Sequence, residues 1–224
     1  MAFIESQINP GVIAEVDPTF KSIRQSLRPL DYQTLQGKIL GHYRAVAVTT
    51  AAAPAANSHL AALRWTDPTN FLVLLRARAF VTVVTAVTAQ RNDPIVLNVA
   101  RGYTARDATN ATVVTISGNN QKARTNMNSS LVANLDVASA AAGLTGGTKT
   151  VDANPHYAIN IGASGLVGLG TNGGGELTNA ENNYIHPLVL SASEGILITW
   201  GPTALATGTV TVTVELGWAE VAAF

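Results

Sequence analysis

The clearest pattern along the chain is a strict alternation of apolar and polar residues over 209–218, which reads TVTVTVELGW. The apolar positions are Val210, Val212, Val214, Leu216 and Trp218. Because successive side chains of a strand point to opposite faces, the alternation predicts a strand with one core face and one solvent face. A shift by one residue would bring three threonines and Glu215 into the core. The register of this strand is therefore well specified.

Further strand signals, rich in β-branched residues and bounded by turn residues, recur through the chain. They cover 44–49, 60–65, 71–90, 95–103, 112–117, 186–190 and 195–200. We expect 71–90 to be one long bent strand, or two strands with a kink near Ala79, and short strands near 131–137 and 157–161. The Gly- and Asn-rich stretch 162–183 predicts one long surface excursion. About eight to ten strands without a βαβ pattern predict a mainly β fold, a β-sandwich of jelly-roll type.

The first 43 residues lack this alternation and contain three prolines. A short helix is expected between Pro18, which fits the first helical position, and Pro29, which ends the run. The apolar residues on one face of this helix are Phe20, Ile23 and Leu27. About ten residues do not hold a helix alone in water, so it must dock on its own domain or on a neighbour. The sequence therefore predicts an extended N-terminal arm with one short helix over 1–43 and a β-sandwich domain over 44–224.

The charge content is low and balanced. The chain has 14 Lys and Arg against 14 Asp and Glu, and 12% of its residues are charged, about half the usual share of roughly 25%. Interface cores are depleted in Lys, Glu and Asp, so this composition suits a chain covered by neighbours; it also suits an ordinary neutral β protein rich in Thr and Ala. Neutrality and the lack of a basic stripe argue against nucleic-acid binding. Neither a signal peptide nor a membrane span is expected, since the start has no basic segment and no apolar run reaches about 18 residues.

No pattern for catalysis or metal binding emerges from the polar residues. The histidines are His42, His59, His156 and His186, none at a spacing that makes a metal motif, and there is no Cys. The Gly-rich stretch 162–175 has no Lys for a phosphate loop, and no GxSxG elbow occurs. Glycoside hydrolysis needs a pair of carboxylates, and the candidate acids outside the arm, Glu176, Glu181, Glu194 and Glu215, are scattered. Trp65, Trp200 and Trp218 fall in strand contexts that indicate core or sheet edge. We therefore expect no enzymatic activity, no metal and no cofactor.

Six segments of the chain carry a resemblance to known proteins. They are EVDPTFKSIRQSLRPLDY (Glu15 to Tyr32), GHYRAVA (Gly41 to Ala47), LRWTDPTN (Leu63 to Asn70), NNQKARTNMNSSLV (Asn119 to Val132), HPLVLSASEGILI (His186 to Ile198) and ELGWAEV (Glu215 to Val221). These segments are similar to virion structural proteins of tailed bacteriophages. The resemblance runs from the arm to the C-terminal end with gaps, and none of these segments is a catalytic signature. It implies a structural component of a particle.

Within that class, we expect a capsid decoration (cement) protein on the capsid exterior, bound to the major capsid protein and to itself as a homotrimer, with no nucleic acid and no membrane as partners. The arm would lie over neighbouring capsid subunits. Its expected anchors are Phe3, Ile4, Phe20, Ile23, Leu27, Tyr32 and Tyr43, and for each of them packing on its own domain is the alternative.

Two other structural roles remain open. The first is a tail- or fibre-associated module that binds a host surface glycan through the loops 118–128 and 162–183, near Tyr157 and Tyr184. The second is a shell-forming subunit, against which the small size and the lack of long helices count.

Overall fold

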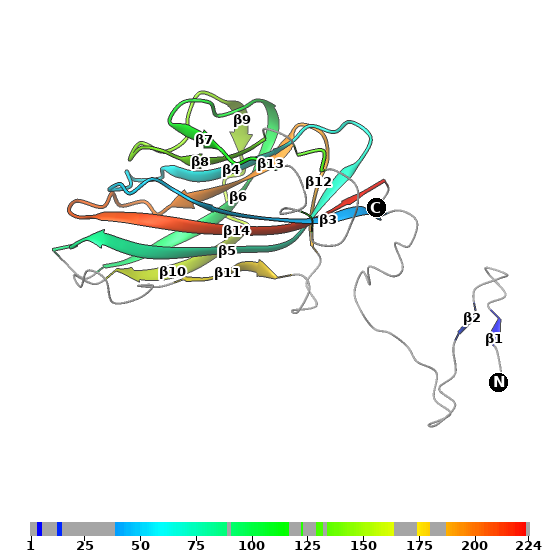
Figure 1. Ribbon diagram of the computed structural model, residues 1–224, viewed down its shortest axis with the longest axis horizontal. Helices are drawn as coiled ribbons and strands as arrows, with labels where there is room; N and C mark the ends of the chain where they lie inside the picture. Colours follow the sequence, from blue (N-terminus) through cyan, green and yellow to red (C-terminus); the bar gives the residue numbers. More distant parts are fainter. Residues whose placement is uncertain are drawn as a thin grey trace.

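The computed structural model describes residues 39–88, 91–116, 122, 129–131, 134–163, 174–179 and 187–222, together with the backbone of the short strands β1 (Ile4–Glu5) and β2 (Ile13–Ala14) (Figure 1). The other strands are β3 (Ile39–Val48), β4 (His59–Trp65), β5 (Phe71–Thr85), β6 (Arg91–Ala105), β7 (Ala111–Val113), β8 (Leu135–Ala138), β9 (Thr148–Val151), β10 (Tyr157–Ala163), β11 (Gly174–Asn179), β12 (Leu188–Leu190), β13 (Glu194–Trp200) and β14 (Thr209–Val221).

These strands form two antiparallel sheets. The seven-stranded sheet has the order β10-β6-β13-β4-β8-β7, with β9 also paired to β6. The five-stranded sheet has the order β11-β5-β14-β3, with β12 also paired to β5. Strands β1 and β2 pair only with each other. Most neighbours in a sheet are not consecutive along the chain, so the chain crosses repeatedly from one layer to the other (Figure 1).

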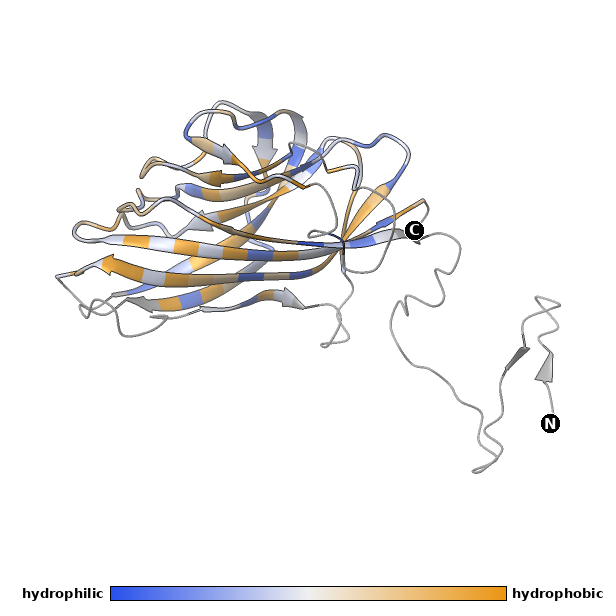
Figure 2. Cartoon of the chain, viewed as in Figure 1, coloured by the Kyte–Doolittle hydropathy of each residue, from blue (hydrophilic) through white to orange (hydrophobic). Residues whose placement is uncertain are grey.

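The two sheets face each other across one main core. Side chains from both sheets form this core, and the tryptophans Trp65, Trp200 and Trp218 are buried in it, as their strand contexts indicate. Along β14 every even position from 210 to 218 is buried while the odd positions are half-buried, which confirms the predicted register. Figure 2 shows the same alternation as bands along β14 and β5.

Strand β5 is one long strand with a change of register. Opposite β14, Arg76 pairs with Gly217 but Leu74 pairs with Trp218, so Leu75 is an extra residue in β5. An extra residue bends a strand and switches which side chains face the core. Leu74 and Ala77 accordingly both point inward although they are three positions apart. One long strand is therefore confirmed over 71–85, and its pairing with β14 is irregular at Leu75 and again at Val84 rather than near Ala79.

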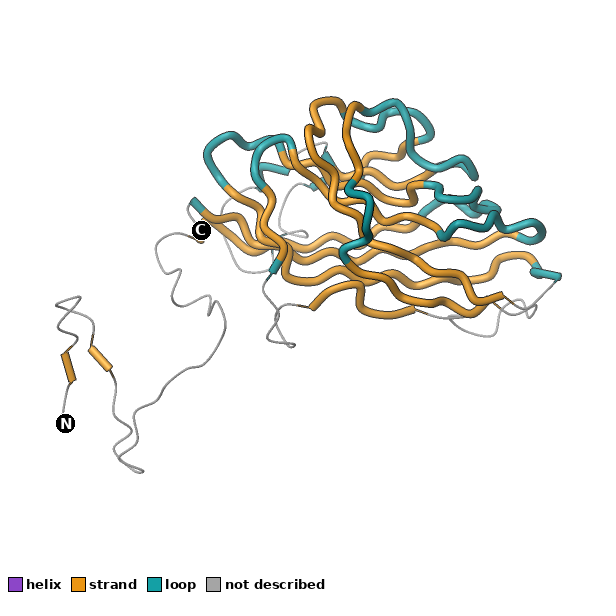
Figure 3. Tube along the Cα trace, turned by 180° about the vertical axis from the view of Figure 1, so that it is seen from behind, coloured by secondary structure: helices purple, strands orange, loops and turns teal. Residues whose placement is uncertain are grey.

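The mainly β prediction is confirmed, because the described residues contain strands and loops but no helix (Figure 3). Within them, no helix of the length and apolarity needed to cross a membrane is found. The expected surface excursion over 162–183 is wrong for 174–179, which form β11. The glycines of β11 are typical of a loop and gave no strand pattern. Gly174 nevertheless suits the strand, since an added Cβ there would lie 2.2 Å from the Phe80 ring of β5. The helix expected between Pro18 and Pro29 lies outside the described residues.

Candidate interaction surfaces

The most exposed large apolar side chains of the described residues lie on β3, which forms one edge of the five-stranded sheet. Val46 is 58% exposed and Val48 is 53% exposed. At the opposite edge the two sheets meet, because Gly175 of β11 lies against Ile159 of β10, where an added Cβ would be 3.6 Å from Ile159 Cγ2. One side of the molecule is therefore closed by contact between the sheets, whereas the other presents an apolar edge strand.

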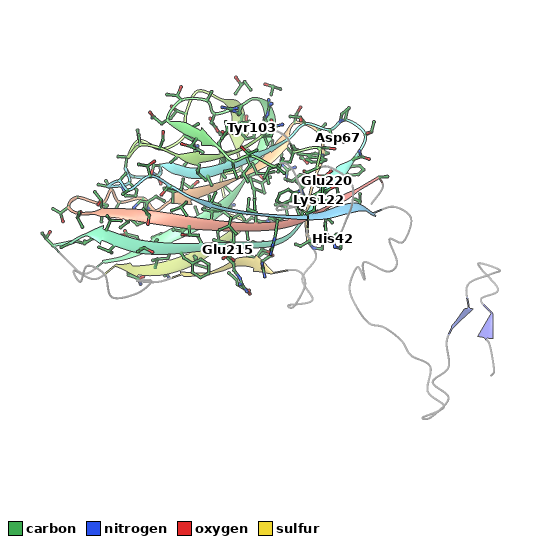
Figure 4. The ribbon with its side chains drawn as sticks, in the orientation of Figure 1. His42, Asp67, Tyr103, Lys122, Glu215 and Glu220 are labelled. Atoms are coloured by element: carbon green, nitrogen blue, oxygen red, sulfur yellow. The ribbon has the colours of Figure 1, made fainter. Side chains whose placement is uncertain are left out.

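The outer face of the five-stranded sheet carries a row of paired charges. Arg78 Nε donates to Glu176 Oε1 at 3.0 Å, and Arg78 Nη1 lies 3.9 Å from Glu215 Oε2. The hydrogen bond to Glu176 is the main cause that raises the pKa of the Arg78 guanidinium. Glu215 lies on the solvent face of β14, as the alternation predicts, and Figure 4 shows it on the outer side of the sheet. Strands β5, β14 and β11 each supply one of these charges, so Arg78 partly compensates the two glutamates.

The outer face of the seven-stranded sheet holds a buried polar cluster of Tyr103, Asp107 and Lys149. The Asp107 carboxylate is fully buried and accepts hydrogen bonds from Lys149 Nζ at 2.6 and 2.7 Å and from the Gly147 N–H at 2.9 Å. The Tyr103 hydroxyl also donates to it in a short bond. Lys149 Nζ lies 5.0 Å from the centroid of the Tyr103 ring, a cation–π distance. The cluster ties the segment around Gly147 onto strand β6.

Ionisation in this cluster follows from burial and from these bonds. Burial opposes the charged form of Asp107, but the hydrogen bonds from Lys149 and Tyr103 outweigh it, and the pKa of Asp107 is lowered. Burial, followed by the bond to Asp107, raises the pKa of the Tyr103 hydroxyl well above its usual range. Burial and the nearby Lys149 charge lower the pKa of His59. Both oxygens of Asp107 accept hydrogen bonds from inside the protein, so the cluster supports the fold.

A second buried carboxyl group, Asp136 of β8, lies near this cluster. It is 1% exposed, its Oδ2 lies 3.2 Å from Arg106 Nε, and neither of its oxygens accepts a hydrogen bond from the described residues. Burial raises its pKa to about 6, although the Arg106 charge opposes this. Asp136 is therefore a group whose ionisation changes within the mildly acidic range.

At the end of β14 a buried glutamate fastens a loop. Glu220 is 1% exposed and accepts hydrogen bonds from Ser129 Oγ at 2.5 Å, from the Ser130 N–H at 3.0 Å and from Trp218 Nε1 at 3.3 Å. Close by, Lys122 forms an isolated antiparallel bridge with Tyr43 of β3, and Figure 4 shows Lys122 and Glu220 at the same end of the molecule. The chain between β7 and β8 is thus attached to both β3 and β14. Sequence reasoning did not single out Glu220, although extending the alternation of β14 by two residues places it on the core face.

The structure places one of the seven expected arm anchors within the described side chains. Tyr43 is 2% exposed and its ring stacks on Trp218 with centroids 5.8 Å apart, so it packs on its own domain. Ile4 lies in β1, whose backbone pairs with β2. The other expected anchors, Phe3, Phe20, Ile23, Leu27 and Tyr32, lie outside the described residues.

The residues considered for metal or glycan binding are not brought together by the fold. Among the described residues, no group of three or more His, Asp or Glu side chains is arranged to hold a metal ion. Tyr157 is half-buried against the main core, and its ring meets His156 edge-to-face at 4.6 Å. Tyr184 and most of the two loops of the glycan hypothesis lie outside the described residues.

Comparison with known proteins adds no relative. A scan against protein-family models, a search of curated proteins and a search of solved structures each found no significant match to this chain.

Proposed function

We propose that this chain is a non-enzymatic structural protein of a bacteriophage virion, of the capsid decoration type, that stabilises the shell by binding across neighbouring capsid subunits. The observation that carries the proposal is the strand order of the two sheets. The order β3-β14-β5-β11 faces the order β4-β13-β6-β10. In both orders the first two neighbours are an early and a late strand, as in the double Greek key of an eight-stranded jelly roll, an architecture common in viral capsid proteins.

The remaining strands of the two sheets fit this interpretation as additions to the jelly roll. Strands β7, β8 and β9 all lie between β6 and β10 along the chain and extend the seven-stranded sheet, and β12 pairs with β5 in the five-stranded sheet. Fold alone does not define function, because jelly rolls also occur in lectins and enzymes. Two features of the surface support the structural role. Charges such as Arg78 and Glu176 are paired within the molecule, and the most exposed apolar residues line a sheet edge.

The proposed mechanism is multivalent attachment. Each arm contributes a weak contact to a neighbouring capsid subunit, and an oligomer such as the expected homotrimer adds these contacts through effective concentration. In this mechanism Phe20, Ile23 and Leu27 form the apolar face that docks, because they share one side of the predicted helix.

The location is tested by electron microscopy of particles purified from the phage that encodes this chain and labelled with an antibody against the chain. Label over the whole head is the expected result. Label at the tail would replace decoration with the tail-associated role, and particles without label would refute a virion protein.

The attachment is tested by co-sedimentation of the purified full chain with capsid shells. We expect the triple substitution F20S/I23S/L27S to reduce binding at least about tenfold, since three apolar anchors are lost from each arm. The matched control is Q25S, which lies mostly away from that face and should bind as the unsubstituted chain does. Circular dichroism checks that each variant is folded. Full binding by the folded triple variant would refute the arm mechanism.

A further inference from the structure

The outer edge of β3 has an unusual combination of exposed apolar side chains and outward main-chain groups. Thr49 N–H donates to Val212 O at 3.0 Å, which continues the β3–β14 ladder in the same register. Because main-chain bonding in antiparallel strands alternates, the N–H and C=O groups of Val46 and Val48 point away from β14. The bridge between Tyr43 and Lys122 covers one end of this edge. Beyond it, no strand of the described residues pairs with Val46 to Val48.

Proteins usually protect such an edge with charged residues, prolines, a bulge or a covering segment. The β3 edge has none of the first three between Ala45 and Val48, since the segment reads AVAV and its pairing with β14 is regular there. The other end of the same sheet is protected, because β11 carries Glu176 and packs against β10 through Gly175. This difference between two ends of one sheet indicates that the β3 edge is covered in an assembly.

We propose that this edge is a self-association site, at which β3 pairs antiparallel with β3 of a second copy and joins the two five-stranded sheets. Val46 lies opposite Val48 of the second copy, and Val48 opposite its Val46. Both pairs use outward main-chain groups, so they exchange about four hydrogen bonds, two in each pair. The four valine side chains then form one apolar strip on the outer face of the joined sheet.

The register follows from the sequence of the edge. Shifting the two-fold axis by one residue in one direction would place Arg44 of each copy on Val48 of the other, and in the opposite direction would place Val46 on Thr50. The proposed register alone pairs all four valines with each other, and apolar cross-strand pairs stabilise a sheet. It also separates the two Arg44 side chains by six residues along the strands, about 20 Å.

A second copy fits this edge better than an unrelated charged partner. The neighbouring outer positions of β14 are Thr213, opposite Val48, and Glu215, opposite Val46 and paired with Arg78. The edge thus presents valines beside a threonine and a glutamate that Arg78 already compensates, and an identical surface meets it without an uncompensated charge. The whole chain has a formal net charge of zero, so two copies do not repel each other at long range.

Sedimentation velocity of the purified full chain over a concentration series tests the proposal. We expect the unsubstituted chain to associate reversibly and the assembly of the double variant V46K/V48K to have half its mass. The variant would be a monomer where the unsubstituted chain is a dimer, or a trimer where it is a hexamer if the expected homotrimer also forms. Facing lysines should raise the dissociation constant at least about tenfold. The matched control V84K, at a valine that is 41% exposed on β5, should associate normally.

The register is tested with cysteine variants of this Cys-free chain. Residues in a hydrogen-bonded antiparallel pair have Cα atoms about 5.5 Å apart, within the disulfide range of about 4.4–6.8 Å. A mixture of V46C and V48C should therefore cross-link more readily than either variant alone.

A mass that V46K/V48K leaves unchanged, or a monomer at every concentration, overturns the proposal. A changed thermal midpoint at unchanged mass would point instead to a segment of the same chain on this edge. Because purified protein alone is used, these outcomes are independent of whether the chain is found in a particle.

Discussion

Removal of the lysine from the buried Tyr103–Asp107–Lys149 cluster should destabilise the protein severely. In the variant K149M the aliphatic stem keeps its packing, but the fully buried Asp107 carboxylate loses a cation that bonds both of its oxygens at 2.6 and 2.7 Å. The bonds from Gly147 and Tyr103 remain. Breaking a buried ion pair by removing one partner costs about 3–5 kcal/mol, and the two remaining donors place the expected loss near the lower end, about 3 kcal/mol. That is a large share of a typical stability of about 5–15 kcal/mol.

The assay is equilibrium unfolding in urea at pH 7, compared through the free energy of unfolding of four proteins: the unsubstituted chain, K149M, D107N and the double variant D107N/K149M. Replacing both charges should return the free energy of unfolding to within about 1 kcal/mol of that of the unsubstituted chain. The amide oxygen introduced by D107N still accepts from the Gly147 N–H, its NH2 group donates to the Tyr103 hydroxyl oxygen, and no ion stays buried. The matched surface control is R101M. Arg101 is 54% exposed in its ion pairs with Glu194 and Asp152, so this variant should lose no more than about 1 kcal/mol.

A loss in K149M no larger than that in R101M would refute the reasoning, as would a double variant less stable than K149M. Acid provides an independent check. The pKa of Asp107 in the folded state lies below its unfolded value of 3.8. The ionised carboxylate therefore stabilises the folded state above pH 3.8, and this stabilisation is lost as the pH falls through the lower folded-state pKa. The difference in stability between the unsubstituted chain and D107N should therefore shrink below about pH 4.

Three further predictions concern other buried positions. The pKa of Asp136 is raised to about 6 from 3.8, so the folded state holds an extra proton between these two values. The free energy of unfolding therefore falls as the pH rises from 4 to 7. In urea titrations D136N should not show this fall, and over that range it should gain about 2 kcal/mol relative to the unsubstituted chain. E220Q should lower the free energy of unfolding by about 1–3 kcal/mol, because it disturbs a buried hydrogen-bond acceptor. The matched variant E215Q, at a half-exposed glutamate, should change it by less than about 1 kcal/mol, and equal losses would contradict the prediction. G195A should lose about 3 kcal/mol or fail to fold, because its Cβ would lie 2.3 Å from a carbonyl oxygen, while G102A, at a φ of +56° with open space around it, should lose only about 1 kcal/mol in thermal unfolding.

The parts of the fold that the sequence predicts are those in which one strand carries its own signal. The alternation over 209–218 determines the register of β14 without reference to any partner. Strand β11 carries no such signal, since its sequence GGELTN is typical of a loop. It becomes a strand because β5 offers it main-chain partners, a ring over Gly174 and a cation for Glu176. Propensity is overridden here by a neighbour nearly one hundred residues away in sequence.

The polar clusters were beyond prediction for a related reason. Asp107 and Lys149 are separated by 42 residues, and neither lies at a spacing that makes a motif. Their pairing follows from the return of β9 to β6, which a single sequence does not specify. Glu220 is the exception, because a charged residue at an even position of an alternating strand conflicts with the core face. Such a conflict predicts a buried bonded carboxylate, and Ser129 and Ser130 supply the bonds.

The low charge content left two interpretations open, a chain covered by neighbours and an ordinary neutral β protein. The two interpretations differ in what they require at the edges of the five-stranded sheet. A β protein that works alone needs every edge protected, since an open apolar edge promotes aggregation. Here Arg78 is paired with Glu176 and Lys149 with Asp107 inside the molecule, and no charge is placed between Ala45 and Val48 on the open edge. If the edge were merely tolerated, a lysine at Val46 would improve solubility and leave association unchanged. If it is an interface, as we propose, the same lysine removes the association, and this opposite outcome distinguishes the two interpretations.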